Sequence, residues 1–166
     1  MLNCKFNAIK DFDINQSEGI SVSLWFQGCE HKCEGCFSPH TWDFNQGEDF
    51  TEETIEFIIH LLTKDEIHKN LSVLGGETLS TNKLGMLEKL LKRVKEINSD
   101  IQVWLWTGYT YEEVGNLSLM SFVDILVDGK YEKELHNPTR YKGSDNQRVI
   151  DVKESKEQKK VIFYSF

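Results

Sequence analysis

Three cysteines in one short loop, Cys29, Cys33 and Cys36, are the residues of this chain best suited to chemistry. Their C-x3-C-x2-C spacing offers three thiolates, one fewer than a closed tetrahedral metal site uses. A [4Fe–4S] cluster normally takes one thiolate for each iron, so three cysteines leave one iron free to bind a molecule that is not protein. The spacing therefore predicts a [4Fe–4S] cluster with an open iron, and it favours an enzyme.

Structural zinc is the alternative for the same cysteines. Either His31 or His40 would supply a fourth ligand, because Cys-x3-Cys-x2-Cys-x3-His also fits a structural zinc site. A disulfide framework fits poorly, since three of the four cysteines are crowded into this one loop. The remaining thiol, Cys4, is expected to be a buried apolar residue of a first strand, with no role in the site.

A second motif, Gly75-Gly76-Glu77, directly follows a predicted strand. Two glycines let the backbone approach a ligand closely and expose its N–H and C=O groups. The carboxylate of Glu77 is able to accept hydrogen bonds from an ammonium group. Alone, this motif also fits an ordinary tight turn between a strand and a helix. Beside a loop of three thiolates it indicates a binding site.

Strands and helices alternate along the chain, which is the α/β pattern. Helices are expected to begin at Thr51, near Leu84 and at Thr110, the first two with a buried stripe at helical spacing. Strands are expected at residues 20–26, 71–74, 101–106, 122–127, 148–152 and 161–164. Right-handed crossovers make the sheet mostly parallel.

In a parallel sheet, ligands gather at the carboxyl ends of the strands. The cysteine loop, the Gly-Gly-Glu motif, Trp106-Thr107-Gly108 and Asp128-Gly129 all follow strands, so we expect them on one rim. A closed eight-stranded barrel needs about 250 residues, and the chain has 166. We therefore expect a single domain over residues 1–166, an open partial (β/α) barrel with its cluster loop at 28–42.

The composition argues against several functional classes. The net charge is −8 and no stripe of lysine and arginine is present, so nucleic-acid binding is not expected. No apolar run approaches the roughly 18 residues that cross a bilayer, so a membrane is not expected either. The N-terminus lacks the features of a signal peptide. Together with the clustered thiols, this predicts a cytoplasmic protein.

The chain resembles radical S-adenosylmethionine (SAM) enzymes, and within them the activating proteins of anaerobic ribonucleoside-triphosphate reductase. The first block, Gln27-Gly-Cys-Glu-His-Lys-Cys-Glu-Gly-Cys-Phe-Ser-Pro-His-Thr-Trp42, is highly specific. The likeness continues through residues 75–79, 103–113, 124–131 and 140–151, which separate this family from other radical SAM enzymes. Two departures stand out: Thr78 replaces a usual proline, and Ser21 replaces an arginine.

The resemblance implies an activity. The three cysteines would bind a [4Fe–4S] cluster, and SAM would chelate its open iron. One electron, from a low-potential donor such as flavodoxin, would cleave SAM to methionine and a 5′-deoxyadenosyl radical. That radical would abstract hydrogen from a glycine of the reductase large subunit. The cofactors carry the hard chemical step, and the protein supplies binding and orientation.

The resemblance also assigns residues to SAM, with Phe37 against the adenine and the Gly-Gly-Glu motif at the methionine end. The cofactor-binding set is Gly35, Cys36, Phe37, Gly75, Gly76 and Glu77. Asp128-Gly129 fits an ordinary turn slightly better than a ligand contact. Trp104 and Trp106 are expected in the core, and 140–148 is expected to be a loop. Two other functions stay open: a radical SAM enzyme acting on a small molecule such as a deazapurine precursor, or a zinc-stabilised interaction module.

Overall fold

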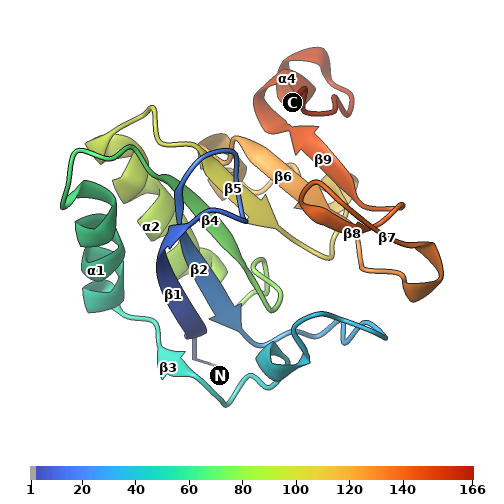
Figure 1. The fold of residues 1–166 in the computed structure, drawn as a ribbon, viewed down its shortest axis with the longest axis horizontal. Helices are drawn as coiled ribbons and strands as arrows, with labels where there is room; N and C mark the ends of the chain where they lie inside the picture. The colour runs from blue at the N-terminus through green and yellow to red at the C-terminus, as the bar shows by residue number, and fades with distance from the viewer. Residues whose placement is uncertain (1–2) are drawn as a thin grey trace.

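The computed structural model describes residues 3–166, and its centre is a seven-stranded sheet of order β3-β1-β2-β4-β5-β6-β9 (Figure 1). The four central strands run parallel: β2 (Ser21–Gln27), β4 (Asn70–Gly75), β5 (Val103–Trp106) and β6 (Ile125–Asp128). Each matches a strand expected from the sequence to within a few residues. Their shared direction brings their carboxyl ends to one edge of the sheet.

Antiparallel strands complete the sheet on both sides. On one side β1 (Lys5–Asp13) pairs with β2 and with β3 (Glu48–Asp49). On the other, β9 (Arg148–Asp151) pairs with β6. Within residues 3–166 neither β3 nor β9 pairs with a further strand, so the sheet does not close into a barrel. The α/β class and the parallel centre are confirmed, whereas a partial barrel of the radical SAM type stays a prediction.

Two helices, α1 (Glu52–Thr63) and α2 (Leu84–Ile97), pack on one face of the sheet (Figure 1). Helix α1 begins after Thr51, whose backbone N–H donates to Thr54 Oγ1 at 3.0 Å, a variant of the capping box. The expected stripes are buried against the sheet: Ile55, Ile58, Ile59 and Leu62 in α1, and Leu87, Leu91 and Val94 in α2. The helix expected at Thr110 is a single turn, α3 (Tyr111–Val114).

The remaining helical segments are short. They are η1 (Pro39–Thr41), η2 (Ser118–Phe122), η3 (Lys133–Leu135) and α4 (Val152–Gln158). Among residues 3–166, no helix combines the length and the apolar character that crossing a membrane requires.

The second face of the sheet carries aromatic residues instead of helices. Side chains alternate along β5, so its valine and leucine face the helices while Trp104 points the other way. Trp104 is fully buried there, because the rings of Tyr141 and Tyr164 cover it at 4.8 and 5.5 Å. This confirms the expectation that Trp104 is a core residue and that its strand is buried on both faces.

Two expectations about the C-terminal part are wrong. The segment 140–148 contains a strand, β8 (Lys142–Ser144), which pairs with β7 (His136–Thr139) in a hairpin. The Gln147 side chain supports this hairpin, since its Oε1 accepts from the N–H groups of Gly143 and Ser144 at 2.8 and 3.1 Å.

Residues 161–164 form a single bridge, between Ile150 and Phe163, instead of a strand. Asp151 starts α4 by accepting from Glu154 N at 2.9 Å, and this leaves only a short tail to return to the sheet. At the other end of the chain, Cys4 is half-buried and lies just before β1 instead of within it. Its partial burial against the core agrees with the expected structural role, and it raises the pKa of the thiol to about 11.

Candidate functional site

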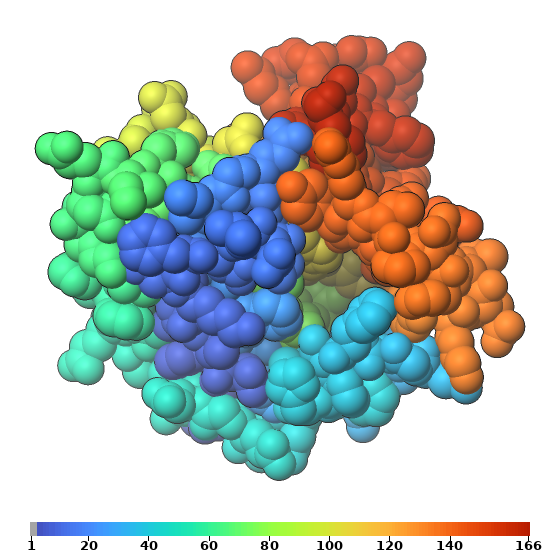
Figure 2. Space-filling view, in the orientation of Figure 1, coloured from blue at the N-terminus to red at the C-terminus, as the bar shows by residue number. Residues whose placement is uncertain are grey.

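A cavity of about 410 Å³ opens at the carboxyl ends of the parallel strands. Its walls come from the cluster loop after β2, the glycine turn Gly75–Glu77 at the end of β4, Trp106–Gly108 at the end of β5, Gly129–Tyr131 after β6, and the β7–β8 hairpin. Figure 2 shows this hollow between the surface of the cluster loop, coloured cyan, and that of the hairpin, coloured orange. The four segments expected on one rim therefore do meet.

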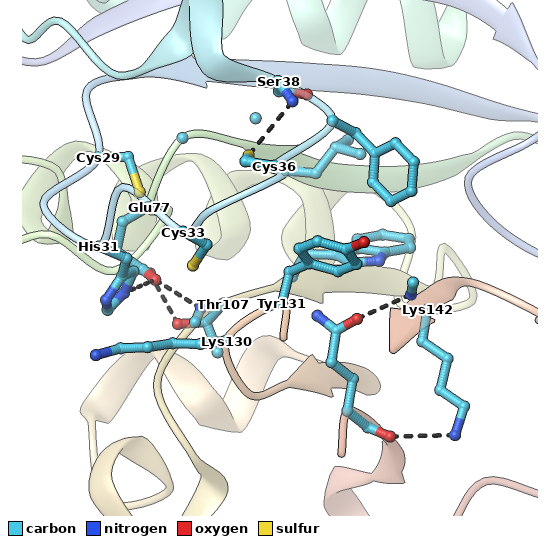
Figure 3. A pocket seen from close by; sticks show the side chains of 18 of the residues that line it. Cys29, His31, Cys33, Cys36, Ser38, Glu77, Thr107, Lys130, Tyr131 and Lys142 are labelled. Atoms are coloured by element: carbon cyan, nitrogen blue, oxygen red, sulfur yellow. Dashed lines mark hydrogen bonds and ion pairs between the residues drawn. The ribbon is translucent and has the colours of Figure 1, made fainter. Parts of the chain in front are cut away.

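The thiols of Cys29, Cys33 and Cys36 all line this cavity, and none is in a disulfide (Figure 3). Cys36 Sγ accepts from Ser38 N at 3.3 Å. Burial raises the pKa of the Cys29 and Cys33 thiols. Coordination to a metal would remove their protons, because a bound cation stabilises the thiolate.

The cluster loop is shaped to turn its cysteines toward the cavity. Gly28, Lys32 and Gly35 have φ values of +98°, +48° and +77°, so the backbone reverses direction around the thiols. Of these, Lys32 adopts a conformation that side chains disfavour. Within residues 3–166, no three His, Cys, Asp or Glu side chains converge closely enough to hold one metal ion.

The two histidines of the zinc alternative lie in different surroundings. His31 lines the cavity, and its Nε2 is 2.7 Å from Glu77 Oε1. His40 is exposed on η1. His31, the histidine that lines the cavity, is thus already hydrogen-bonded through Nε2 to a carboxylate.

The Glu77 carboxylate is a brace within the protein. Its side chain is fully buried, and Oε1 accepts from Gly108 N at 2.7 Å besides its bond to His31. Oε2 accepts from Leu79 N at 2.8 Å and from Thr107 Oγ1 at 2.7 Å. We expected this carboxylate to be available to a ligand's ammonium group, but four protein donors already bond to it. It ties the cluster loop, the glycine turn and the end of β5 together.

A second carboxylate braces the same loop. Glu30 accepts from Tyr109 Oη at 2.6 Å and from Ser80 Oγ at 2.8 Å. The hydrogen bond to Glu30, together with burial, raises the pKa of the Tyr109 phenol. The Tyr109 ring also packs against His31 at 4.7 Å between centroids. Sequence reasoning missed this network, although Tyr109 belongs to one of the blocks that carry the family resemblance.

The two glycines of the turn are required by close backbone contacts. A Cβ on Gly76 would lie 2.3 Å from Gly28 O, and one on Gly75 would lie 2.6 Å from Phe26 N. Gly75 also has a φ of +106°. Glu77 N donates to Gly28 O at 2.9 Å, which joins the glycine turn to the cluster loop. The need for glycine thus arises from the neighbouring chain segments as well as from any ligand.

The two departures from the family pattern have separate structural outcomes. Thr78, in place of proline, is buried and donates through Oγ1 to Trp106 O at 2.6 Å, a bond that proline would not make. Ser21 is the first residue of β2, at the opposite end of that strand from the cluster loop. A serine at this position is therefore remote from the cysteines.

The structure also gives the positions of three further residues considered from the sequence, Trp106, Phe37 and Asp128. Trp106 is partly buried and packs against the Trp104 cluster, as expected for a core residue, but it also lines the cavity and donates to Tyr141 O at 2.8 Å. Phe37 also lines the cavity, is 67% exposed, and packs against Tyr131 at 5.5 Å. Asp128 is buried and accepts hydrogen bonds from Arg148 at 2.5 and 3.0 Å, so it holds the Asp128-Gly129 turn in place.

Replacing Glu77 with glutamine is expected to lower the free energy of unfolding by about 2–4 kcal/mol, because an amide nitrogen would face donors that now have an acceptor. Urea unfolding of the metal-free protein measures this change. Glu34→Gln is the matched control, since the Glu34 side chain is 82% exposed. Equal unfolding midpoints for Glu77→Gln and the unsubstituted protein would contradict the bracing role of the Glu77 carboxylate.

Comparison with known proteins decides the family. Residues 15–150 match a family model described as a 4Fe-4S single cluster domain. The anaerobic ribonucleoside-triphosphate reductase-activating protein of Enterobacteria phage T4 is 36% identical over 144 residues, 87% of this chain and 92% of its own length. The chain belongs to the family of anaerobic ribonucleoside-triphosphate reductase-activating proteins.

Further members of the activating-protein family agree. The activating protein of Vibrio cholerae is 35% identical over 141 residues, covering 82% of this chain and 91% of its own length. That of Escherichia coli K12 is 32% identical over 141 residues, covering 82% and 92%. The resemblance stated from the sequence motifs is thus confirmed, and the cluster-domain match supports an iron–sulfur cluster in this chain.

Proposed function

We propose that this protein activates anaerobic ribonucleoside-triphosphate reductase by reductive cleavage of SAM at a [4Fe–4S] cluster. When bound, the cluster and SAM would supply a 5′-deoxyadenosyl radical that abstracts hydrogen from a glycine of the reductase large subunit. The observation that carries the proposal is the meeting of Cys29, Cys33 and Cys36 with the glycine turn on one cavity. Family membership supports the reductase as the target.

In this proposal the three thiols hold the cluster, and the glycine turn receives the methionine end of SAM through its backbone. The Glu77 side chain fixes the turn instead of binding the ligand, because its oxygens are already bonded. Phe37 presents an exposed ring at the cavity, available to stack on the adenine. The cofactor contacts proposed are Gly35, Cys36, Phe37, Gly75, Gly76 and the backbone of Glu77.

Aromatic residues line much of the cavity. Trp25, Trp106, Tyr131 and Tyr141 line it with aromatic surface, and Pro138 adds to the apolar lining. Such walls confine a reactive species and exclude competing reactions with solvent. This is the protein's own contribution to the chemistry beyond holding its cofactors.

The remaining parts of the proposal concern the electron donor and the cellular compartment. A low-potential donor such as flavodoxin would provide the electron. Three unpaired thiols in one loop suit a reducing compartment, so we place the activity in the cytoplasm.

The test is an anaerobic reaction with SAM, a reductant and the reductase large subunit. We expect iron and labile sulfide in the purified protein, methionine and 5′-deoxyadenosine as products, and a glycyl radical signal on the reductase. Reductase labelled with α-deuterated glycine should transfer deuterium to 5′-deoxyadenosine. SAM cleavage without deuterium transfer or a protein radical would favour a small-molecule substrate. Zinc without labile sulfide, in protein never exposed to air, would overturn the proposal.

A further inference from the structure

Lys83 is a fully buried cation at the junction of the cluster loop and the glycine turn. Its Nζ donates to Gly28 O at 2.7 Å and to Glu77 O at 2.6 Å, and Ser80 Oγ lies at 3.5 Å. Gly28 directly precedes the first cysteine of the loop. One ammonium group therefore contacts both segments that frame the candidate cluster site.

This cation has no carboxylate in direct contact among residues 3–166. The nearest aromatic rings are Phe44 and Phe26, at 5.0 and 5.8 Å from Nζ. Lys69, the other fully buried lysine, differs because it is ion-paired with Asp11 and Asp65 at 3.1 Å each. Burial lowers the pKa of Lys83 to about 8. The ammonium form is therefore still the main form at neutral pH.

The two carbonyls that Lys83 contacts do not depend on it for a donor. Gly28 O also accepts from Glu77 N at 2.9 Å, and Glu77 O also accepts from Ser80 Oγ at 3.1 Å. Burying an ion without a counter-ion is unfavourable by several kcal/mol. Within residues 3–166, the carboxylates of Glu77 and Glu30 attract this ammonium through space without contacting it. A further negative charge in the adjoining cavity would therefore stabilise it.

We propose that Lys83 is a positioning residue for the cluster: it holds Gly28 against Glu77, and its charge offsets the negative charge of the thiolates and of the reduced cluster. This inference rests on the proposed function for the presence of the cluster. It assigns no contact between Lys83 and SAM or the reductase. Its consequence is that Lys83 favours the reduced state, because reduction adds a negative charge near a buried positive one.

The experiment compares Lys83→Met, Lys83→Gln and Lys83→Arg with the unsubstituted protein, in anaerobically reconstituted samples without SAM or reductase. The reduced-to-oxidised ratio of the cluster is read by absorption and spin resonance at one fixed solution potential. We expect the ratio to fall about tenfold in the Met and Gln variants, as loss of one nearby charge implies, and to recover in the Arg variant. Iron and sulfide content are measured alongside.

Lys95→Met is the matched control, because Lys95 lies in the last turn of α2, whereas Lys83 immediately precedes that helix. Lys95 Nζ also donates to a backbone carbonyl, Ile101 O, at 2.7 Å, and unlike Lys83 it is ion-paired, with Asp124 at 2.7 Å. This variant should lower the melting temperature and leave the cluster ratio unchanged. The general effect of losing a lysine charge at α2 is thereby separated from the effect of losing the charge that adjoins the candidate cluster site.

Three outcomes would overturn the inference. The first is an unchanged ratio in the loaded Lys83→Met protein. The second is failure of both neutral variants to fold without metal, since Lys83 would then serve the fold instead of the cluster. The third is a fall that Lys83→Arg does not recover. An unsubstituted protein that takes up no iron and sulfide would instead overturn the proposed function, and this inference with it.

Discussion

Replacing Cys33 with alanine is expected to abolish cluster assembly and SAM cleavage while leaving the α/β core folded. Two thiolates would remain where the proposed cluster needs three, and a site without its middle ligand does not retain iron. The cluster loop lies outside the main hydrophobic core, which joins the sheet to α1 and α2. Iron and sulfide analysis, product assays for SAM cleavage, and thermal unfolding of the metal-free protein measure the three parts of this result.

Cys4→Ala is the matched control, because Cys4 is the one cysteine outside the loop. It lies before β1 and packs against the core, so this variant should keep its cluster and its SAM cleavage. Continued SAM cleavage by Cys33→Ala would contradict the assignment of the loop. Loss of the cluster in Cys4→Ala would show that the loop alone does not account for the ligands.

Gly76→Ala is expected to reduce SAM cleavage by about a hundredfold, the scale of effect that follows from misplacing a reactant by about 1 Å. The added Cβ would lie 2.3 Å from Gly28 O and 3.0 Å from Thr41 O, both backbone atoms. The glycine turn would have to move away from the cluster loop. Product formation per bound cluster, with iron content measured in the same sample, tests this expectation.

Gly85→Ala provides the comparison, since a Cβ on Gly85 meets no atom within 4 Å. Gly85 lies in α2, where alanine is the better helix former by about 1 kcal/mol. This variant should cleave SAM normally and unfold at a slightly higher temperature. Normal SAM cleavage by Gly76→Ala would mean that the close approach of the turn to the loop does not matter for activity.

The parts of the site that were predictable from the sequence are those carried by local patterns. The spacing of Cys29, Cys33 and Cys36 identifies them as candidate ligands. The glycine turn is recognised by its position directly after an apolar strand. The helix stripes were predictable for the same reason, because side chains three and four positions apart share a face. Parallel strands then place their carboxyl ends on one rim without any knowledge of individual contacts.

The parts that were not predictable depend on contacts between distant segments. His31 and Glu77 are 46 positions apart, and Gly108 and Glu77 are 31 apart. The Gly-Gly-Glu motif itself does not show that the Glu77 carboxylate is hydrogen-bonded to residues of distant segments. Lys83 is a similar case, since a lysine before an amphipathic helix ordinarily indicates a solvated position, and only the fold buries it.

The hairpin and the position of Trp106 at the cavity were not predicted, for a related reason. Residues 140–148 are polar and contain glycine, which is typical of a loop, but the Gln147 side chain supplies bonds that stabilise the strand pairing. Trp106 was expected in the core beside Trp104. It does stack on Trp104, but it lies at the last position of β5 and therefore also reaches the rim of the cavity.

The β7–β8 hairpin forms part of the wall of the cavity that the cysteines line, and its late position in the chain has a consequence for synthesis. Lys133, just before the hairpin, and Glu34, in the cluster loop, lie 3.4 Å apart in space but 99 positions apart in sequence. During translation the thiols therefore emerge from the ribosome long before the hairpin that completes the wall of their cavity. The cavity that the three thiols line is therefore complete only after the β7–β8 hairpin has been made.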